Sequence, residues 1–156
     1  MSYKVTKTEE ASQEKFQTFE DLEVYKAARE FRKAMYAMTR RLPDFEKYDL
    51  ASQIRRASVS LTNNMAEGHG RYHYPDQIRF FLRSRGSLEE LVDDLNVCLD
   101  ENYVSSDEVA KRKEEARSVL ALSNGYLRYL QSRSSSVRES DSADSELVNP
   151  VESLPL

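Results

Sequence analysis

The stretch VYKAAREFRKAMYAMTRRL, residues 24–42, decides the fold class, because its apolar residues recur at alternating spacings of four and three. On an α-helix this period forms one apolar stripe, made of Val24, Ala28, Phe31, Met35, Met38 and Leu42. Basic Arg40 and Arg41 come near the end of the stretch, where they complement the helix dipole, and Pro43 cannot continue the helix. We therefore predict a helix from about Asp21 to Leu42.

Three later segments repeat this alternation. The first runs from about residue 49 to residue 68 or 70. The second opens near Pro75, a residue type favoured in the first turn of a helix. The third begins at Ser105, where Glu108 three residues later completes a capping-box pattern. The predicted stripes are, in order, Leu50, Ile54, Ala57, Leu61 and Asn64; Ile78, Phe81, Arg85, Leu88, Val92, Leu95 and Leu99; and Val109, Ala116, Leu120, Ser123, Leu127 and Leu130.

Helices of this length joined by short connections pack as antiparallel neighbours. The sequence thus predicts an all-α protein with an antiparallel up-and-down four-helix bundle over residues 19–132. Residues 1–18 are polar with little periodicity, and we predict a loose N-terminal arm there. Residues 133–156 are rich in serine and acids, and we predict a disordered acidic tail. Further apolar residues outside the stripes favour self-association.

Composition restricts the class of protein. The chain has 156 residues, which suits one domain, and no stretch is long and apolar enough for a membrane span. The N-terminus lacks the apolar segment of a secretory leader. Cys98 is alone, which excludes an internal disulfide and favours a cytoplasmic protein with Cys98 as a small buried residue.

The charge is unevenly distributed along the chain. Its net value is −4, but basic residues exceed acidic ones by six between Arg29 and Arg85. Acidic residues exceed basic ones by seven between Gly86 and Glu115. Such a division favours either head-to-tail self-association or a polyanion bound on one side of the domain.

Patterns that would indicate catalysis or a metal site are weak. His69 and His73 are four residues apart, but two histidines are too few for a metal site, and Gly68 and Gly70 argue against one continuous helix through the pair. There is no glycine-rich phosphate loop and no Gly-x-Ser-x-Gly motif. We expect no enzyme activity, no metal and no cofactor.

A group of arginines and tyrosines is a candidate nucleic-acid surface, because arginine contacts phosphates and tyrosine stacks on unpaired bases. The competing interpretation is a face of salt bridges, either solvated or between subunits. The candidate residues are Arg55, Arg56, Arg71, Tyr72, Tyr74, Arg79 and Arg83.

Polar residues also occupy positions where leucine would be the usual choice. Asn64 and Arg85 fall on the predicted stripes, with Glu67 and Glu90 as candidate partners. Buried polar side chains need such partners, and their pairing can determine helix register and oligomeric state. We interpret these four residues as structural.

Five motifs, in order, resemble those of one known family. They are FEDLEVYKAA (19–28), SQIRRASVS (52–60), NMAEG (64–68), FLR (81–83) and GSLEEL (86–91). Together they resemble the four-helix-bundle proteins encoded in intervening sequences of bacterial 23S ribosomal RNA genes, over roughly residues 19–130. Thr62-Asn63 and the serine-rich tail depart from the family pattern.

The resemblance implies an antiparallel four-helix bundle assembled as a ring-like homopentamer, without known catalytic activity and associated with ribosomal RNA. A related bundle, the accessory protein of diversity-generating retroelements, binds a reverse transcriptase and nucleic acid. The family motif includes several of the residues singled out above, without a settled role for any of them: Arg55, Arg56, Asn64, Glu67, Gly68, Arg71, Gly86 and Glu90.

We therefore expect a non-catalytic oligomeric accessory protein that binds ribosomal RNA or another nucleic acid through its Arg/Tyr patches. The alternative is a scaffold for protein–protein interactions with no nucleic-acid role. We further expect Gly86 to permit close approach of two helices, because glycine otherwise costs about 1 kcal/mol inside a helix.

Overall fold

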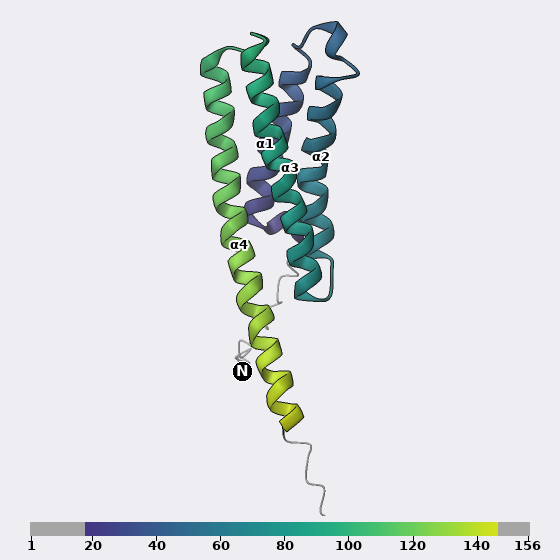
Figure 1. Cartoon of the computed structure of the whole chain (residues 1–156), viewed down its shortest axis with the longest axis vertical. Helices are drawn as coiled ribbons and strands as arrows, with labels where there is room; N and C mark the ends of the chain where they lie inside the picture. Colours follow the sequence, from purple (N-terminus) through teal and green to yellow (C-terminus); the bar gives the residue numbers. More distant parts are fainter. Residues whose placement is uncertain (1–17, 147–156) are drawn as a thin grey trace, which may run out of the picture.

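The computed structural model describes residues 18–146, and over these residues the chain is entirely helical, with four α-helices and no strand (Figure 1). The α-helices are α1 (Glu23–Thr39), α2 (Leu50–His69), α3 (Tyr74–Asp100) and α4 (Ser106–Glu146). Short 3-10 helices precede α1 and α2, at Phe19–Asp21 and Asp44–Glu46. The predicted arm, apart from Thr18, and the end of the predicted tail (147–156) lie outside the described residues.

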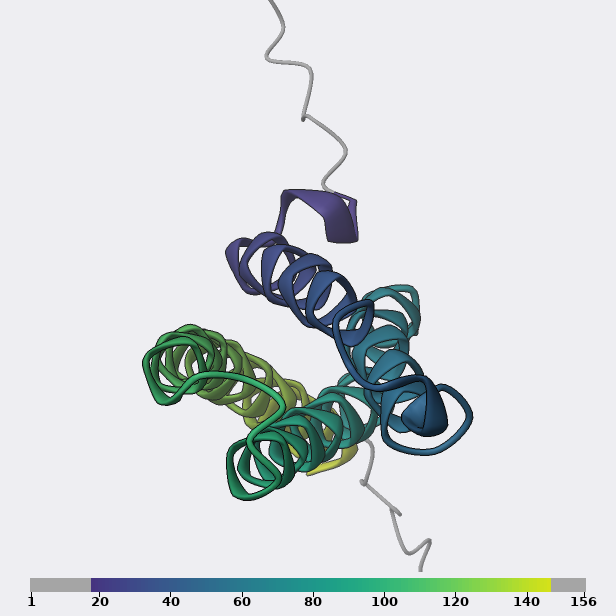
Figure 2. The same ribbon diagram turned by 90° about the horizontal axis from the view of Figure 1, so that it is seen from above.

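Each α-helix packs against its two neighbours around the bundle. Contacts join α1 with α2, α2 with α3, α3 with α4, and α4 with α1, and none join the diagonal pairs among the described residues. The view along the bundle shows this four-sided arrangement (Figure 2). The prediction of an all-α four-helix architecture is confirmed.

The core contains most of the predicted stripe positions, with one systematic shift. All six stripe residues of α1 are buried. In α2, Met65 is fully buried and the neighbouring Asn64 is only half-buried, so the stripe prediction was wrong at its end. In α3, Leu91 and Cys98 are buried where we predicted Val92 and Leu99. The buried positions of α3 also alternate by three and four, so the predicted period was right and the stripe took the wrong neighbour once in each heptad: Phe81, Ser84, Leu88, Leu91, Leu95 and Cys98 are buried.

Gly86 does not permit close helix packing, contrary to our expectation. A Cβ atom placed on Gly86 would meet nothing within 4 Å. The close approach occurs instead at Gly68, where a Cβ would lie 2.9 Å from the Cβ of Phe80. The backbone of α2 therefore lies directly against α3 near the connection between these two helices.

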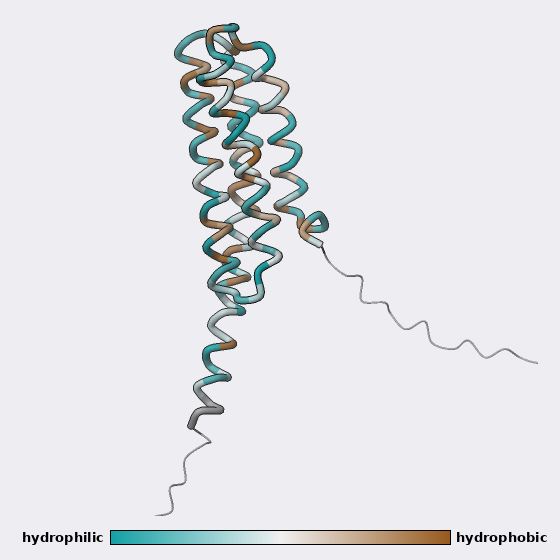
Figure 3. Tube along the Cα trace, turned by 90° about the vertical axis from the view of Figure 1, so that its right-hand side faces the viewer, coloured by the Kyte–Doolittle hydropathy of each residue, from teal (hydrophilic) through white to brown (hydrophobic). Residues whose placement is uncertain are grey.

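Helix α4 extends past residue 132, where we expected the bundle to end and disorder to begin. The helix continues to Glu146, and this part projects beyond the other three helices (Figure 3). No glycine or proline occurs between residues 126 and 149 to stop it. Its serines donate hydrogen bonds to carbonyls one turn earlier, for example Ser132 to Tyr129 and Ser135 to Gln131. No helix among the described residues has the length and apolar character needed to cross a bilayer.

The N-terminus of α4 has half of the predicted capping box. The Ser105 hydroxyl accepts a hydrogen bond from the Glu108 backbone N–H at 3.2 Å. The Glu108 carboxylate does not return to Ser105 but binds Arg41, two residues after the end of α1, with 2.8 Å between Arg41 Nη1 and Glu108 Oε2. This ion pair lowers the pKa of Glu108. It ties the end of the α1 segment to the start of α4.

Replacing Ser105 with alanine is expected to lower the free energy of unfolding by about 1 kcal/mol, because the Glu108 N–H loses its acceptor. Urea denaturation followed by circular dichroism measures the change. Ser118→Ala is the matched control, since Ser118 lies exposed inside α4 and only donates back to the Glu114 carbonyl. Equal destabilisation by both substitutions would contradict a capping role for Ser105.

Candidate nucleic-acid interface

The chain reverses direction in the short connection between α2 and α3. Helix α2 ends at His69, residues 70–73 turn, and α3 starts at Tyr74 with Pro75 in its first turn. Because Gly68 has no side chain, α2 lies close enough to α3 to bring Arg71 over the ring of Phe80. Phe80 is 6% exposed, so its ring forms the floor of this surface.

Three guanidinium groups surround this ring. The Cζ atoms of Arg71, Arg83 and Arg79 lie 4.6, 5.0 and 5.8 Å from the ring centroid. Cations at such distances are attracted to the negative face of an aromatic ring, which holds the three arginines together despite their like charge. We refer to Arg71, Arg79, Phe80 and Arg83 as the Phe80 cluster.

Two members of the Phe80 cluster also have acidic partners. Arg71 donates to Glu67 at 2.7 Å, one turn earlier on α2, and Arg79 donates to Asp76 at 2.8 Å. Neither ion pair includes Arg83. These partners orient the side chains and leave the cluster with an excess of positive charge.

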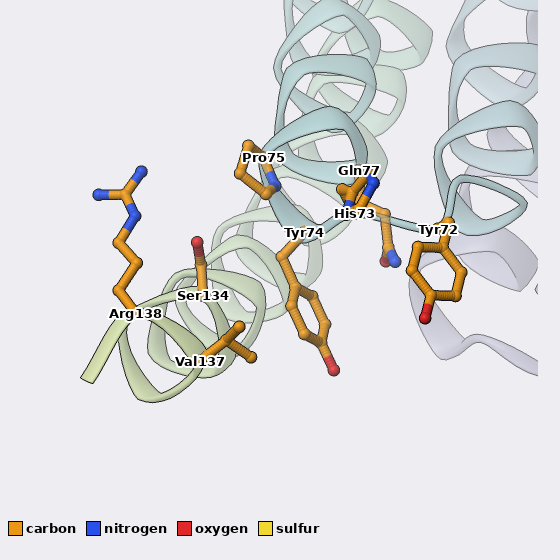
Figure 4. A pocket seen from close by; sticks show the side chains of 8 residues that line it. All are labelled: Tyr72, His73, Tyr74, Pro75, Gln77, Ser134, Val137 and Arg138. Carbon is orange, nitrogen blue, oxygen red and sulfur yellow. The ribbon is translucent and has the colours of Figure 1, made fainter. Parts of the chain in front are cut away.

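Two tyrosines, Tyr72 and Tyr74, follow Arg71 along the chain. Tyr72 is 92% exposed, and its ring meets His73 edge-on at 5.0 Å between centroids. Tyr74 is half-buried, and its hydroxyl interacts with Arg133 of α4, which raises the pKa of Arg133. Tyr72 and Tyr74 both line an open cavity of about 540 Å³ between the start of α3 and the projecting part of α4 (Figure 4). An aromatic ring as exposed as that of Tyr72 is available for stacking.

Arg55 and Arg56 do not belong to this surface. They lie in the first half of α2, and at about 1.5 Å per residue the helix places them roughly 20 Å from Arg71. Arg55 Nη2 donates to the Lys47 carbonyl at 3.2 Å, and Arg56 is exposed. The structure therefore divides the predicted Arg/Tyr group into two separate surfaces.

The four polar residues that we interpreted as structural have hydrogen-bond or ion-pair partners other than those we expected. Asn64 donates to the carbonyl and hydroxyl of Ser60 at 2.8 and 3.1 Å, within its own helix. Arg85 donates to Asn124 of α4 at 3.1 Å, which links two helices. Glu67 belongs with Arg71, as described above.

Glu90 is exposed, and its charge contributes to a raised pKa of the buried Asp94 one turn away. Only Arg85 thus makes a contact between helices among the four predicted register residues. Asn124 was missed because an asparagine off the apolar stripe has no distinctive pattern.

Phe80 was also missed as a site residue. The signal was present in part, because Arg79 and Arg83 flank Phe80 at positions −1 and +3 on one helical face. No such pattern marks Arg71, which reaches the ring only through the turn at 70–73. Among the described residues no group of three histidines, cysteines or carboxylates could hold a metal ion.

Comparison with known proteins identifies one family. No curated protein matches the chain. The model of the family described as 23S rRNA-intervening sequence protein matches residues 20–125, which is more than half of the chain and runs from the start of the bundle into α4. The chain therefore belongs to the 23S rRNA-intervening sequence protein family.

Proposed function

We propose that this chain is a non-catalytic accessory protein that binds RNA through the Phe80 cluster and Tyr72. One observation carries the proposal: three guanidinium groups gather on one aromatic ring, and Tyr72, which follows Arg71 in the chain, is 92% exposed. Guanidinium groups bind phosphates through directed hydrogen bonds, and a free tyrosine ring stacks on an unpaired base. The family description supports ribosomal RNA as the ligand to test first.

A role without catalysis is supported by the state of the reactive groups. Burial raises the pKa of the Cys98 thiol to about 11, so it holds its proton at neutral pH and is a poor nucleophile. The Phe80 cluster contains arginines and no general base. Its chemistry is that of binding.

A ring-like homo-oligomer, a pentamer in the resemblance, would repeat the Phe80 cluster around one axis. Several weak contacts then add through multivalency. Exposed apolar side chains on α3, among them Leu82, Val97 and Leu99, are available for contacts between copies.

Reversing the charge of two cluster residues tests the proposal. Arg79→Glu/Arg83→Glu is expected to weaken binding to structured 23S rRNA fragments about tenfold or more, because two phosphate contacts are lost. Each lost contact should also reduce the slope of log affinity against log salt concentration by roughly 0.7–0.9. Fluorescence anisotropy across a salt series gives both the affinity and the slope.

The matched control is Arg117→Glu/Arg128→Glu on α4. Arg117 resembles Arg79 in having an acidic partner one turn away and a mostly exposed side chain. The control should lose less affinity than the cluster variant. If the two variants bind equally well, the Phe80 cluster is not the RNA surface.

The second candidate function is a scaffold for protein–protein interactions that binds no RNA. It is favoured by the ion pairs that partly neutralise Arg71 and Arg79. In that case the wild-type protein fails to bind RNA even at low salt. Charge reversal would instead change the oligomeric state seen by sedimentation velocity.

A further inference from the structure

A second basic surface lies on the outer side of α1 and α2. Two adjoining cavities there, of about 520 and 480 Å³, share Tyr36 and Arg40. We call them together the α1–α2 groove. Its charged lining has five basic residues against the single acid Asp44: Arg32, Lys33, Arg40, Lys47 and Arg55.

The helical period explains the groove. Arg32, Tyr36 and Arg40 are four residues apart, so they share one face of α1 with about 6 Å between successive positions. From α2, Arg55 lines one cavity and the exposed Val59 lines the other. The groove therefore presents a row of basic groups with a tyrosine in its middle.

Two of the three arginines of the groove are held by neutral oxygen atoms. Arg32 Nη1 donates to the Thr62 hydroxyl at 2.7 Å, which bridges α1 and α2, and Arg55 Nη2 donates to the Lys47 carbonyl. A guanidinium group bonded to a hydroxyl or carbonyl is oriented but keeps its full charge and its remaining donors.

Many arginines elsewhere on the bundle differ in this respect, although Arg85 also donates to a neutral oxygen, that of Asn124. Five of them are paired with carboxylates: Arg41, Arg71, Arg79, Arg112 and Arg117. In the groove, Lys33 pairs with Glu30 and Asp44 offsets one further base, so the net charge remains positive. Arginine side chains that are held in place but not neutralised by a carboxylate point to an anionic ligand.

We propose that the α1–α2 groove binds the sugar–phosphate backbone of single-stranded RNA, as a second binding surface separate from the Phe80 cluster. This inference rests on the proposed function. A positively charged groove with an aromatic ring in it is the arrangement that follows a single strand.

The chain has no tryptophan, so Tyr36→Trp places a single tryptophan in the groove, which can be excited at a wavelength where tyrosine does not absorb. Titration with a uridine oligonucleotide is expected to quench this fluorescence by stacking and to saturate. Leu122→Trp on the exposed side of α4 is the control and should show little quenching. Equal quenching of both probes would show that the tryptophan does not report binding in the groove.

The double substitution Arg40→Gln/Arg55→Gln tests the charge of the groove. Both arginines lie at the surface, and neither is paired with a carboxylate among the described residues. Two lost phosphate contacts on a single strand should reduce the salt slope by about 1.4, with weaker binding of the oligonucleotide. Arg117→Gln/Arg128→Gln removes the same charge from α4 and should leave the slope unchanged.

The outcomes separate the two proposals. If Arg40→Gln/Arg55→Gln keeps the wild-type slope while Arg79→Glu/Arg83→Glu loses affinity, the groove proposal fails and the Phe80 cluster stands. If the wild-type protein binds no RNA at low salt, both fail. If the groove variant alters the sedimentation coefficient and not the salt slope, the groove is an interface with an acidic surface of another copy, and the RNA proposal for it is overturned.

Discussion

Replacing Gly68 with alanine is expected to lower the free energy of unfolding by about 2 kcal/mol, although alanine is the better helix former. The added Cβ would lie 2.9 Å from Phe80 Cβ, 3.1 Å from Phe81 Cδ2 and 3.3 Å from the Gln77 carbonyl oxygen. Cβ and carbonyl atoms cannot rotate away, so α2 and α3 must separate. Urea denaturation measures the loss.

Gly86→Ala is the matched control, because Gly86 also lies inside a helix but is exposed with no neighbour in the way. It should raise the free energy of unfolding by about 0.5–1 kcal/mol through helix propensity. The two substitutions thus differ in sign. If Gly68→Ala also raised the free energy of unfolding, α2 and α3 would have room for a methyl group at Gly68.

The core of α1 was predictable residue by residue. The single apolar stripe of α1 is also its buried face. In α3, apolar residues stand side by side at Leu91 and Val92, so the period alone does not decide which of them is buried. The stripe took Val92 in place of the buried Leu91, whereas the burial of Cys98, predicted from its residue type, is confirmed.

Gly68 and Gly86 show a limit of local sequence patterns. Both are glycines inside helices, and nothing in their immediate neighbours distinguishes them. The distinction depends on which side of each helix meets α2 or α3, and that requires the register between helices. For the same reason the Arg32–Thr62 hydrogen bond, 30 residues apart along the chain, could not be predicted.

The candidate site was predictable only in its composition. The abundance of arginine and tyrosine between residues 55 and 83 correctly marked a basic region. These residues are close along the chain but do not form one surface, because the length of α2 separates Arg55 from Arg71 by roughly 20 Å. The Phe80 cluster exists because a short turn brings Arg71 back beside α3.

Asp94 is expected to make the protein less stable at neutral pH than at mildly acidic pH. It lies on α3, is 5% exposed, and its Oδ2 atom has no hydrogen-bond partner among the described residues. Burial, with help from the charges of Glu90 and Asp93, raises its pKa from 3.8 to about 6. In the unfolded chain this carboxyl is solvated and titrates near its ordinary value of about 3.9.

The direction of the pH effect follows from proton binding. Between pH 4 and 6 the folded chain holds the Asp94 proton more tightly than the unfolded chain does, so stability falls as the pH rises through this window. Above pH 6 the penalty is complete, at about 3 kcal/mol for a shift of this size. At lower pH, below the unfolded pKa, Asp94 contributes no penalty.

Asp94→Asn is therefore expected to raise the free energy of unfolding at pH 7 by about 2 kcal/mol, since the neutral amide avoids the buried charge and costs about 1 kcal/mol for its own incomplete hydrogen bonding. At pH 4 the gain should disappear, because wild-type Asp94 is then protonated in the fold. Asp93→Asn, at an exposed neighbouring position, is the control and should change stability by less than about 0.5 kcal/mol at either pH. Urea denaturation of the wild type and the two variants at pH 4 and pH 7 measures the difference. If Asp94→Asn raised the free energy of unfolding equally at both pH values, packing and not the buried charge would set the cost of Asp94.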